Sequence, residues 1–580
     1  MLMHSATAHT TPKRVVGLPP RVADGVLLLA LFIGSLLLRL PFRAGSLVNW
    51  DSVNFALGTQ VFDLAHHQPH PPGYIGYVLI GSALNYITGD PVASLTLLST
   101  VAGAFAVVLL FLLGSQFMPR HYAATTAILF ALSPVVWYYS EVPLTYTMEV
   151  ALALAFLWTG YKARTNGSLK FLLVATVLLA ILGAVRQSGA FLLLPLWVYF
   201  AWAFPWRVRR QALAVLIISN LTWLIPLLWM SGGPIAYVEE MFKLSRAAVT
   251  PVSVFTLNGW GLLRNIAFVV GGFLVGINLA LVPIIVAFCR GGNPITKLIR
   301  QDRTFFLLWA GPALFIYLII HTGQLGYVLL ILPIGFLFVG TALVSLTKEG
   351  PDPQRNEHRN SWTRLRNFPV GLVVIGVLAN VLAFFSLPGV IYAVAGNEGT
   401  TVVDNLAVSA SGETHGLTKA RARQYDIKRN DAHWQELISF IHRFDPKTTA
   451  ILAVPDGAGS YRQLTYYLPE YPVYGLGKDL RGNFGHLMTA RGGQDAFTVD
   501  RLDMAAWRLS IPPTIQRVVI PDPGVFNHLE MQDLPSSKVS LYSGSEVVVV
   551  QVPPITTLTL YSVNKENKEP IYLLVRSRTS

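Results

Sequence analysis

The feature that most constrains the fold of this chain is a series of eleven long apolar segments. Stretches of about 17 to 25 apolar residues are long enough to cross a bilayer as helices. Such stretches occupy residues 23–42, 93–115, 122–138, 145–161, 170–185, 188–204, 211–229, 265–288, 304–320, 325–346 and 369–391. Only 13% of the 580 residues are charged, whereas soluble domains have roughly 25%. The sequence therefore predicts an α-helical polytopic membrane protein with about eleven transmembrane helices.

The distribution of basic residues between the loops predicts the orientation of these helices. Lys and Arg concentrate in the short cytoplasmic loops of membrane proteins. Residues 1–22 and every second loop after them hold 19 basic residues, whereas the alternate loops hold about five. We therefore expect residues 1–22 to be a cytoplasmic tail before an uncleaved first span. The net charge of +13 then reflects topology, and nucleic acid is not an expected partner.

One further apolar stretch, at residues 73–89, does not fit this alternation as a span. A crossing there would move the basic loops that follow it to the outer side, against the same charge rule. Its residues Tyr74, Tyr77 and Tyr86 suit a membrane interface. We expect two interfacial helices, at residues 55–65 and 73–89, within a long first outer loop at residues 43–92. Such a loop indicates a cavity, because irregular backbone at membrane depth needs protein or water as a partner.

The last part of the chain, residues 392–580, lacks long apolar runs. Residues 398–430 show no periodicity, which favours a loose connection. The patterns further on predict an amphipathic helix at residues 431–444 and strands at 449–454, 518–520 and 545–552. An odd number of spans places this segment outside. We therefore expect an extracytoplasmic α/β domain after a transmembrane module at residues 23–391.

Two acidic residues at the predicted outer ends of spans are candidates for catalysis. Asp51, beside Trp50, could act as a general base toward a hydroxyl group or as a metal ligand. It could equally cap the helix that follows, because Asp is a favoured N-cap. Glu141 ends an aromatic run, where an ionisable group is either functional or simply solvated at the interface. Glu149 lies deeper, where an acid is costlier to bury, and could be a partner for Arg186.

Histidines crowd the turn between the two expected interfacial helices. His66, His67 and His70 could in principle bind zinc, but adjacent histidines do not readily share one metal geometry. Pro69, Pro71 and Pro72 favour a rigid turn instead. His70 alone could donate a hydrogen bond to a phosphate.

Basic residues on the same predicted side could form an anion site. Arg186 follows the fifth span in a very short turn, where it could bind phosphate oxygens bidentately or extend to lipid head groups. Further candidates for this outer-face site are Lys243, Arg246, Arg264, His321 and Gln324.

Several of these residues together resemble a known family. The motifs are Trp50-Asp51-Ser52, His70-Pro71-Pro72-Gly73-Tyr74, Ala131-Leu132-Ser133-Pro134, Tyr139-Ser140-Glu141, Arg186-Gln187-Ser188-Gly189 and Leu194-Pro195. Over roughly residues 24–340, their order and spacing resemble the GT-C membrane glycosyltransferases, especially the branch of protein O-mannosyltransferases and bacterial aminoarabinose transferases. Less specifically, Tyr461-Arg462-Gln463-Leu464 and Tyr466-Tyr467-Leu468-Pro469 are similar to the tails of bacterial members.

The resemblance implies an inverting transfer of a hexose or pentose from a polyprenyl-phosphate donor to an acceptor hydroxyl. It matches the family's acidic positions to Asp51 and Glu141, and we assign donor-phosphate binding to Arg186, His70, Arg264 and His321. Many members carry two adjacent acids in the first loop, whereas this chain has Asp51-Ser52. That departure leaves a paired-carboxylate or metal role for this position in doubt. A divalent metal is therefore allowed as a cofactor but not required, because phosphate is a good leaving group.

Two alternatives stay open on the sequence alone. One is a polytopic transporter or lipid flippase with an outer domain, and the other is an oligosaccharide ligase or polymerase that uses a pyrophosphate-linked donor. A transporter should carry ionisable or broken-helix sites near the bilayer midplane, whereas most candidates here lie at the outer face. The expected partners are the lipid-linked donor, a protein, lipid or glycan acceptor, and membrane lipids. The expected location is a bacterial inner membrane.

Overall fold

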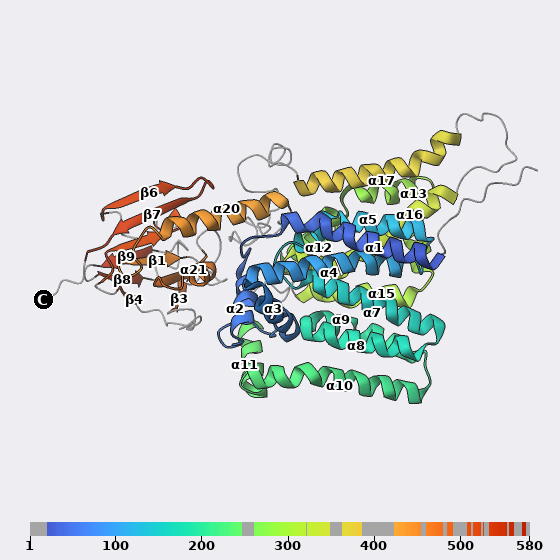
Figure 1. The fold of residues 1–580 in the computed structure, drawn as a ribbon, viewed down its shortest axis with the longest axis horizontal. Helices are drawn as coiled ribbons and strands as arrows, with labels where there is room; N and C mark the ends of the chain where they lie inside the picture. The colour runs from blue at the N-terminus through green and yellow to red at the C-terminus, as the bar shows by residue number, and fades with distance from the viewer. Residues whose placement is uncertain are drawn as a thin grey trace, which may run out of the picture.

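The structure is a computed structural model, and it consists of a helical part followed by two β-sheets. It describes residues 20–245, 260–320, 322–348, 362–385, 423–453, 460–478, 484–490, 507–511, 514–523, 526, 533–553, 556–561 and 571–575. Figure 1 shows the helical part and the sheets next to one another along the longest axis, with the short helices α2 and α3 at the end of the helical part that faces the sheets.

The helical part follows the apolar pattern of the sequence. Its longer helices are α1 (Pro20–Arg39), α4 (Pro91–Gly114), α5 (Arg120–Ala131), α7 (Tyr146–Asn166), α8 (Leu169–Val185), α9 (Gln187–Trp202), α10 (Trp206–Met230), α12 (Trp260–Ile277), α15 (Arg303–Phe315), α16 (Leu332–Lys348) and α17 (Trp362–Phe385). Shorter ones are η1 (Leu40–Phe42), α6 (Pro134–Tyr139), α11 (Pro234–Leu244), η4 (Asn278–Leu281), α13 (Val282–Cys289), α14 (Pro294–Ile299), η5 (Ile316–Ile320) and η6 (Leu325–Leu330). Each of the eleven predicted segments is largely helical.

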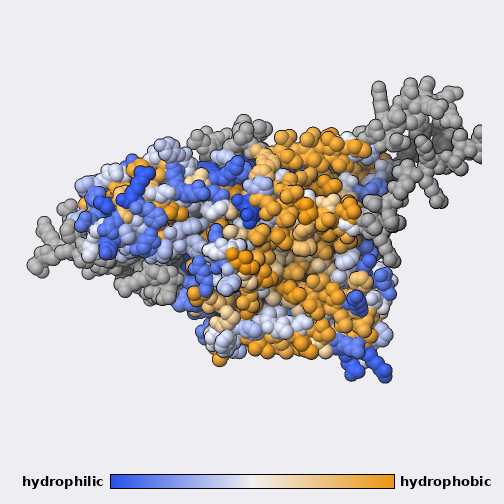
Figure 2. Space-filling view, viewed as in Figure 1, coloured by the Kyte–Doolittle hydropathy of each residue, from blue (hydrophilic) through white to orange (hydrophobic). Residues whose placement is uncertain are grey.

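Five helical stretches in the described part of the chain are long and apolar enough to cross a membrane. They are Asp24–Phe42, Pro91–Gly114, Trp206–Met230, Asn265–Cys289 and Arg303–Ile320. Figure 2 shows an apolar surface over the helices, with hydrophilic residues toward the sheets and at the opposite end. The polytopic helical fold is therefore confirmed, whereas the number of eleven spans stays a prediction.

The first outer loop contains the two expected short helices, α2 (Trp50–Gln60) and α3 (Ile75–Thr88). Helix α3 matches the prediction closely, but α2 begins five residues before the predicted start. Asn49 caps α2, because its side chain accepts a hydrogen bond from the Ser52 amide while Ser52 Oγ accepts one from the Asn49 amide. The interpretation of Asp51 as the N-cap is therefore wrong, since Asp51 lies within the first helical turn.

The C-terminal part combines helices with a mixed sheet, as the sequence predicts. Its elements are α20 (Gln424–Ile441), β1 (Thr449–Ala453), α21 (Tyr461–Tyr467), β2 (Val473–Lys478), β3 (Phe484–Ala490), β5 (Arg517–Ile520), β6 (Ser536–Ser540) and β7 (Glu546–Gln551). The strand order is β3-β2-β1-β5-β7-β6, with β1 parallel to β2 and β5. A separate antiparallel sheet joins β4 (Trp507–Ile511), β8 (Thr556–Tyr561) and β9 (Ile571–Val575).

Helix α20 begins at Gln424 instead of residue 431, so the end of the predicted loose connection is wrong. Residues 398–422 of that connection, and the predicted boundary at 391–392, lie outside the described residues. Trp434, Leu437 and Ile441 of α20 are buried with β1 and with Tyr461 and Leu464 of α21 in one apolar core. Trp50 of α2 packs against that same core. The core therefore joins the C-terminal part to the helix that carries Asp51.

Candidate active site

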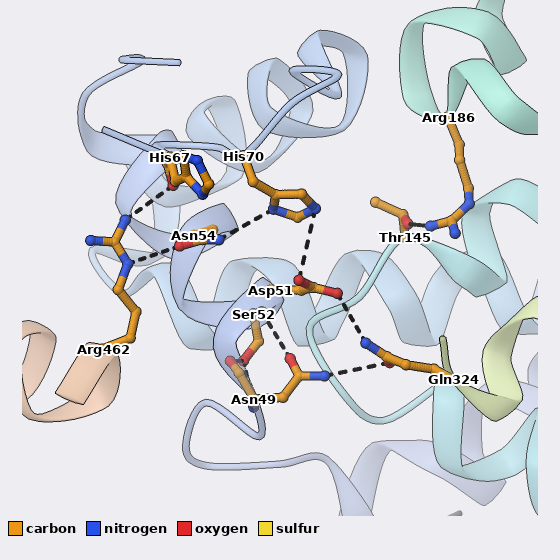
Figure 3. A network of polar contacts seen from close by, with 10 residues as sticks. All are labelled: Asn49, Asp51, Ser52, Asn54, His67, His70, Thr145, Arg186, Gln324 and Arg462. Carbon is orange, nitrogen blue, oxygen red and sulfur yellow. Dashed lines mark hydrogen bonds and ion pairs between the residues drawn. The ribbon is translucent and has the colours of Figure 1, made fainter. Parts of the chain in front are cut away.

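Asp51 lies in the first turn of α2, where side chains from distant parts of the chain meet. Its Oδ2 accepts a hydrogen bond of 2.9 Å from Nε2 of Gln324, and Gln324 Oε1 accepts one of 3.4 Å from Asn49 (Figure 3). The side chain of Asp51 is 34% exposed. A carboxylate that is held by a neutral donor and still open to solvent can accept a proton from a bound hydroxyl group.

His70 lies on the other oxygen of Asp51. Its Nε2 is 3.8 Å from Asp51 Oδ1, which is an electrostatic contact and longer than a hydrogen bond. Its Nδ1 is 3.3 Å from Nδ2 of Asn54. The rings of Phe55 and Tyr74 pack against the imidazole. Burial lowers the pKa of His70, so that the neutral imidazole is favoured.

Arg186 is the cation of this site, and it separates α8 from α9. Its Nε is 3.0 Å from Oε2 of Glu149, and its Nη1 donates a hydrogen bond of 2.8 Å to Thr145. The guanidinium also lies over the rings of Tyr146 and Tyr327, at 4.4 and 5.1 Å from their centroids. The expected partnership of Arg186 with Glu149 is therefore confirmed. Because the guanidinium is buried in this cage, its orientation is fixed in advance of any ligand.

Arg186 and Asp51 belong to one electrostatic environment. Figure 3 shows the Arg186 side chain directed toward the side on which Asp51 and Gln324 lie. The charge of Arg186 also acts on His70, where it lowers the pKa, and Asp51 opposes it. Asp51, His70 and Arg186 therefore lie in one region, although more than 130 positions of the chain separate Asp51 from Arg186.

Glu141 has a different set of neighbours. It follows α6, is fully buried, and interacts electrostatically with Arg39 of α1. Arg39 in turn donates hydrogen bonds to the carbonyl oxygens of Ser35 and Ala131. The backbone of Glu141 accepts a hydrogen bond from the amide of Ala44, close to the start of the first outer loop. A catalytic role for Glu141 stays a prediction.

The C-terminal part contributes a residue that sequence reasoning missed. Arg462 of α21 is 1% exposed, and its Nε donates a hydrogen bond of 2.8 Å to Oδ1 of Asn54. Its Nη2 donates to the carbonyl oxygens of His66 and His67 at 3.0 and 3.1 Å. Burial lowers the pKa of Arg462 to about 10. The only signal in the sequence was the similarity of residues 461–464 to the tails of bacterial GT-C enzymes.

Comparison with solved structures identifies the fold. ArnT from Cupriavidus metallidurans bound to undecaprenyl phosphate superposes with a TM-score of 0.50 at 13% identity, covering 91% of this chain and 97% of that one. The chain has a GT-C-like fold. AglB from Archaeoglobus fulgidus, in complex with an inhibitory peptide and a dolichol-phosphate, gives a TM-score of 0.41 at 14% identity over 78% and 63% of the two chains. No protein-family model and no curated protein matches the sequence.

The structure does not test two of the residues predicted for the phosphate site of this GT-C-like protein. His321 lies outside the described residues, and Arg264 belongs to α12 but its side chain is not among those described. Their roles stay predictions. Gln324, a further candidate for the same anion site, donates a hydrogen bond to Asp51, and its role in that site stays a prediction.

The described residues do not form a metal centre. They contain no group of three or more His, Cys, Asp or Glu side chains that could hold a metal ion. The three-histidine zinc site is not formed, because His66 pairs with Asp63 at 2.6 Å while His70 turns toward Asp51. A divalent metal as cofactor stays a prediction.

Proposed function

We propose that this protein is an inverting glycosyltransferase that moves a sugar from a polyprenyl-phosphate donor to an acceptor hydroxyl at the outer face of a membrane. The observation that carries this proposal is the partly exposed carboxylate of Asp51, held by Gln324 and facing the same region as the buried Arg186. The GT-C-like fold supports it, because the ArnT structure that shares this fold binds undecaprenyl phosphate.

The proposed reaction is a single displacement at the anomeric carbon. The acceptor oxygen attacks that carbon, the bond from the carbon to the phosphate oxygen breaks, and polyprenyl phosphate leaves with the bonding electrons. Asp51 takes the proton of the attacking hydroxyl as general base. Attack from the face opposite to the leaving group inverts the anomeric configuration.

Arg186 is proposed to stabilise the negative charge that develops on the leaving phosphate. A preorganised donor in a buried site stabilises developing charge without reorganising during the reaction. The contacts with Glu149, Thr145, Tyr146 and Tyr327 fix the guanidinium in this way. His70, Arg264 and His321 are proposed as additional contacts to the phosphate, and Glu141 as a second acid in the catalytic region. The protein is proposed to reside in a bacterial inner membrane with its C-terminal sheets outside.

The test is sugar transfer by the purified protein in detergent, with radiolabelled hexose and pentose donors on polyprenyl phosphate and a membrane extract as acceptor. We expect transfer by the wild type and a loss of at least about 100-fold in Asp51→Asn, since general-base catalysis contributes on that order. Asp63→Asn is a matched control, because Asp63 has a similar exposure of 38% in the same loop but pairs with His66. Near-normal transfer by Asp51→Asn would contradict the proposed function.

The same assay separates the alternatives. Detergent removes any compartment, so that a transporter or flippase would leave the donor unchanged. An oligosaccharide ligase or polymerase would consume a pyrophosphate-linked oligosaccharide and spare the monosaccharide phosphate donors.

A further inference from the structure

We propose that Arg462 of the C-terminal part is a positioning residue for Asp51. Through Asn54 it holds His70 in the tautomer that carries its proton on Nε2, the nitrogen that faces Asp51. The significance for catalysis rests on the function proposed above, whereas the hydrogen-bond chain itself does not.

The first step of the chain fixes the amide of Asn54. A guanidinium has only donors, so the Asn54 atom that faces Arg462 must be the carbonyl oxygen. That oxygen is 2.8 Å from Nε of Arg462. Asn54 is fully buried and Arg462 is nearly so. A flipped amide would place its NH₂ group against another donor in a buried site, which is costly.

The second step fixes the proton of His70. With the oxygen of Asn54 committed to Arg462, the amide nitrogen faces His70 Nδ1 at 3.3 Å. An amide nitrogen only donates, so Nδ1 must accept and carries no proton. A neutral imidazole then holds its proton on Nε2, which is 3.8 Å from Oδ1 of Asp51.

Arg462 is itself held in place from both sides. Its Nη2 donates to the carbonyl oxygens of His66 and His67 in the turn before His70. Its neighbours Tyr461 and Leu464 are buried in the core of the C-terminal part. The C-terminal part therefore contacts α2 through Arg462 and determines the hydrogen-bonding state of His70, which contacts Asp51.

This arrangement matters for a general base. An N–H group that faces a carboxylate favours its charged form, which is the form that accepts a proton. The opposite tautomer would place the Nε2 lone pair against the carboxylate and disfavour that form. By favouring the Nε2–H tautomer of His70, the C-terminal part favours the charged form of Asp51, in addition to any binding role.

The test reads the histidine tautomer directly. Full-length protein labelled with ¹⁵N-histidine is studied by NMR in lipid nanodiscs, where protonated and unprotonated ring nitrogens have different shifts. The His70 signals are those lost in His70→Gln. We expect a proton on Nε2 alone in the wild type. Arg462→Met frees the amide of Asn54 to rotate and should populate both tautomers.

A second variant, Asn54→Asp, changes the contact with His70 and retains the contact with Arg462. Asn54→Asp still gives Arg462 an acceptor, but its other oxygen accepts instead of donating, so Nδ1 of His70 should become protonated. Asp431→Asn, which alters another contact between the C-terminal part and the first outer loop, should leave the His70 signals unchanged. A wild type with its proton on Nδ1, or a His70 unchanged in Asn54→Asp, would overturn the proposal.

Kinetics then separate this proposal from the function on which it rests. In the transfer assay, Arg462→Met should lower kcat by a larger factor than it raises the KM for the donor. The altered tautomer of His70 acts on Asp51, the proposed general base, and weakens only one of the proposed phosphate contacts. Unchanged kcat with a changed tautomer would overturn the positioning role. If the wild type transfers no sugar but the tautomers respond as expected, the proposed function fails while the hydrogen-bond chain stands.

Discussion

Nε of Arg186 lies 3.0 Å from Oε2 of Glu149, and both side chains are almost completely buried. The pair joins α7 to the turn between α8 and α9. A buried cation with a fixed acidic partner avoids the cost of an isolated buried charge. The orientation of the guanidinium therefore depends on Glu149 as well as on the aromatic rings around it.

Breaking this pair should destabilise the protein. Glu149→Gln leaves Arg186 buried without a counter-charge, and we expect a loss of about 3 kcal/mol in the free energy of unfolding. Thermal unfolding in detergent, followed by tryptophan fluorescence, measures the change. The double variant Glu149→Gln/Arg186→Met removes both charges and should regain most of the stability. A double variant as unstable as Glu149→Gln would argue against the ion pair as the cause.

Removing the donor to Asp51 should reduce transfer without abolishing it. Gln324→Leu deletes the hydrogen bond of 2.9 Å to Oδ2. Hydrogen bonds to charged groups contribute about 1.5–3 kcal/mol, so we expect kcat to fall by about tenfold or more. Gln301→Leu is the control, because Gln301 donates to the carbonyl of Phe117, away from Asp51. Equal activities in the two variants would contradict this role of Gln324.

The buried His70 should make stability depend on pH. Burial is the main cause of its lowered pKa; the charges of Arg186 and Arg462 lower it further, and Asp51 raises it. Between the folded-state pKa and the ordinary value near 6.5, the unfolded chain binds more protons, so stability is lost as the pH falls below about 6.5.

The matched variant for this prediction is His70→Gln, which can accept from Asn54 but does not titrate. Melting temperatures at about pH 7.5 and pH 5.5 should differ less in this variant than in the wild type. His67, whose pKa burial also lowers, should leave a residual slope in both proteins. An equal pH dependence in the two proteins would contradict the assignment to His70.

The contact between α20 and the first outer loop should protect that loop from hydrogen exchange. Asp431 accepts a hydrogen bond from the amide of Gly45 at 2.9 Å, and Tyr467 Oη accepts one from the amide of Leu47 at 2.7 Å. The variant Asp431→Ala/Tyr467→Phe should speed exchange of each of these two amides by about fivefold, because each lost hydrogen bond contributes about 1 kcal/mol.

A control for this exchange experiment lies elsewhere in the C-terminal part. His442→Ala removes an exposed contact with Glu470 and should leave residues 43–50 unchanged. If the double variant exchanges at the wild-type rate, the protection of the loop comes from other contacts.

Several features of the site were predictable from local sequence. Asp51 and Arg186 stand out in the sequence because ionisable residues next to apolar segments are costly and often functional. Glu149 lies deeper in a neighbouring segment, where a buried acid favours a basic partner such as Arg186. The partners of Asp51 were not predictable in the same way. Gln324 lies 273 positions away from Asp51 in the chain, and neither Asn54 nor Arg462 differs in its local pattern from an ordinary polar residue in a helix.

Hydrophobic periodicity within a few turns of chain was enough to predict the apolar helices, the short helices of the first outer loop, and one helix and three strands of the C-terminal part. Which side chains share a site depends on how distant segments pack together. Asn49 capped α2 in place of Asp51, and folding brought α21 onto α2, so that Arg462, Asn54 and His70 form one hydrogen-bond chain to Asp51. Such chains depend on donor and acceptor geometry between distant segments, and hydrophobic pattern carries no information about it.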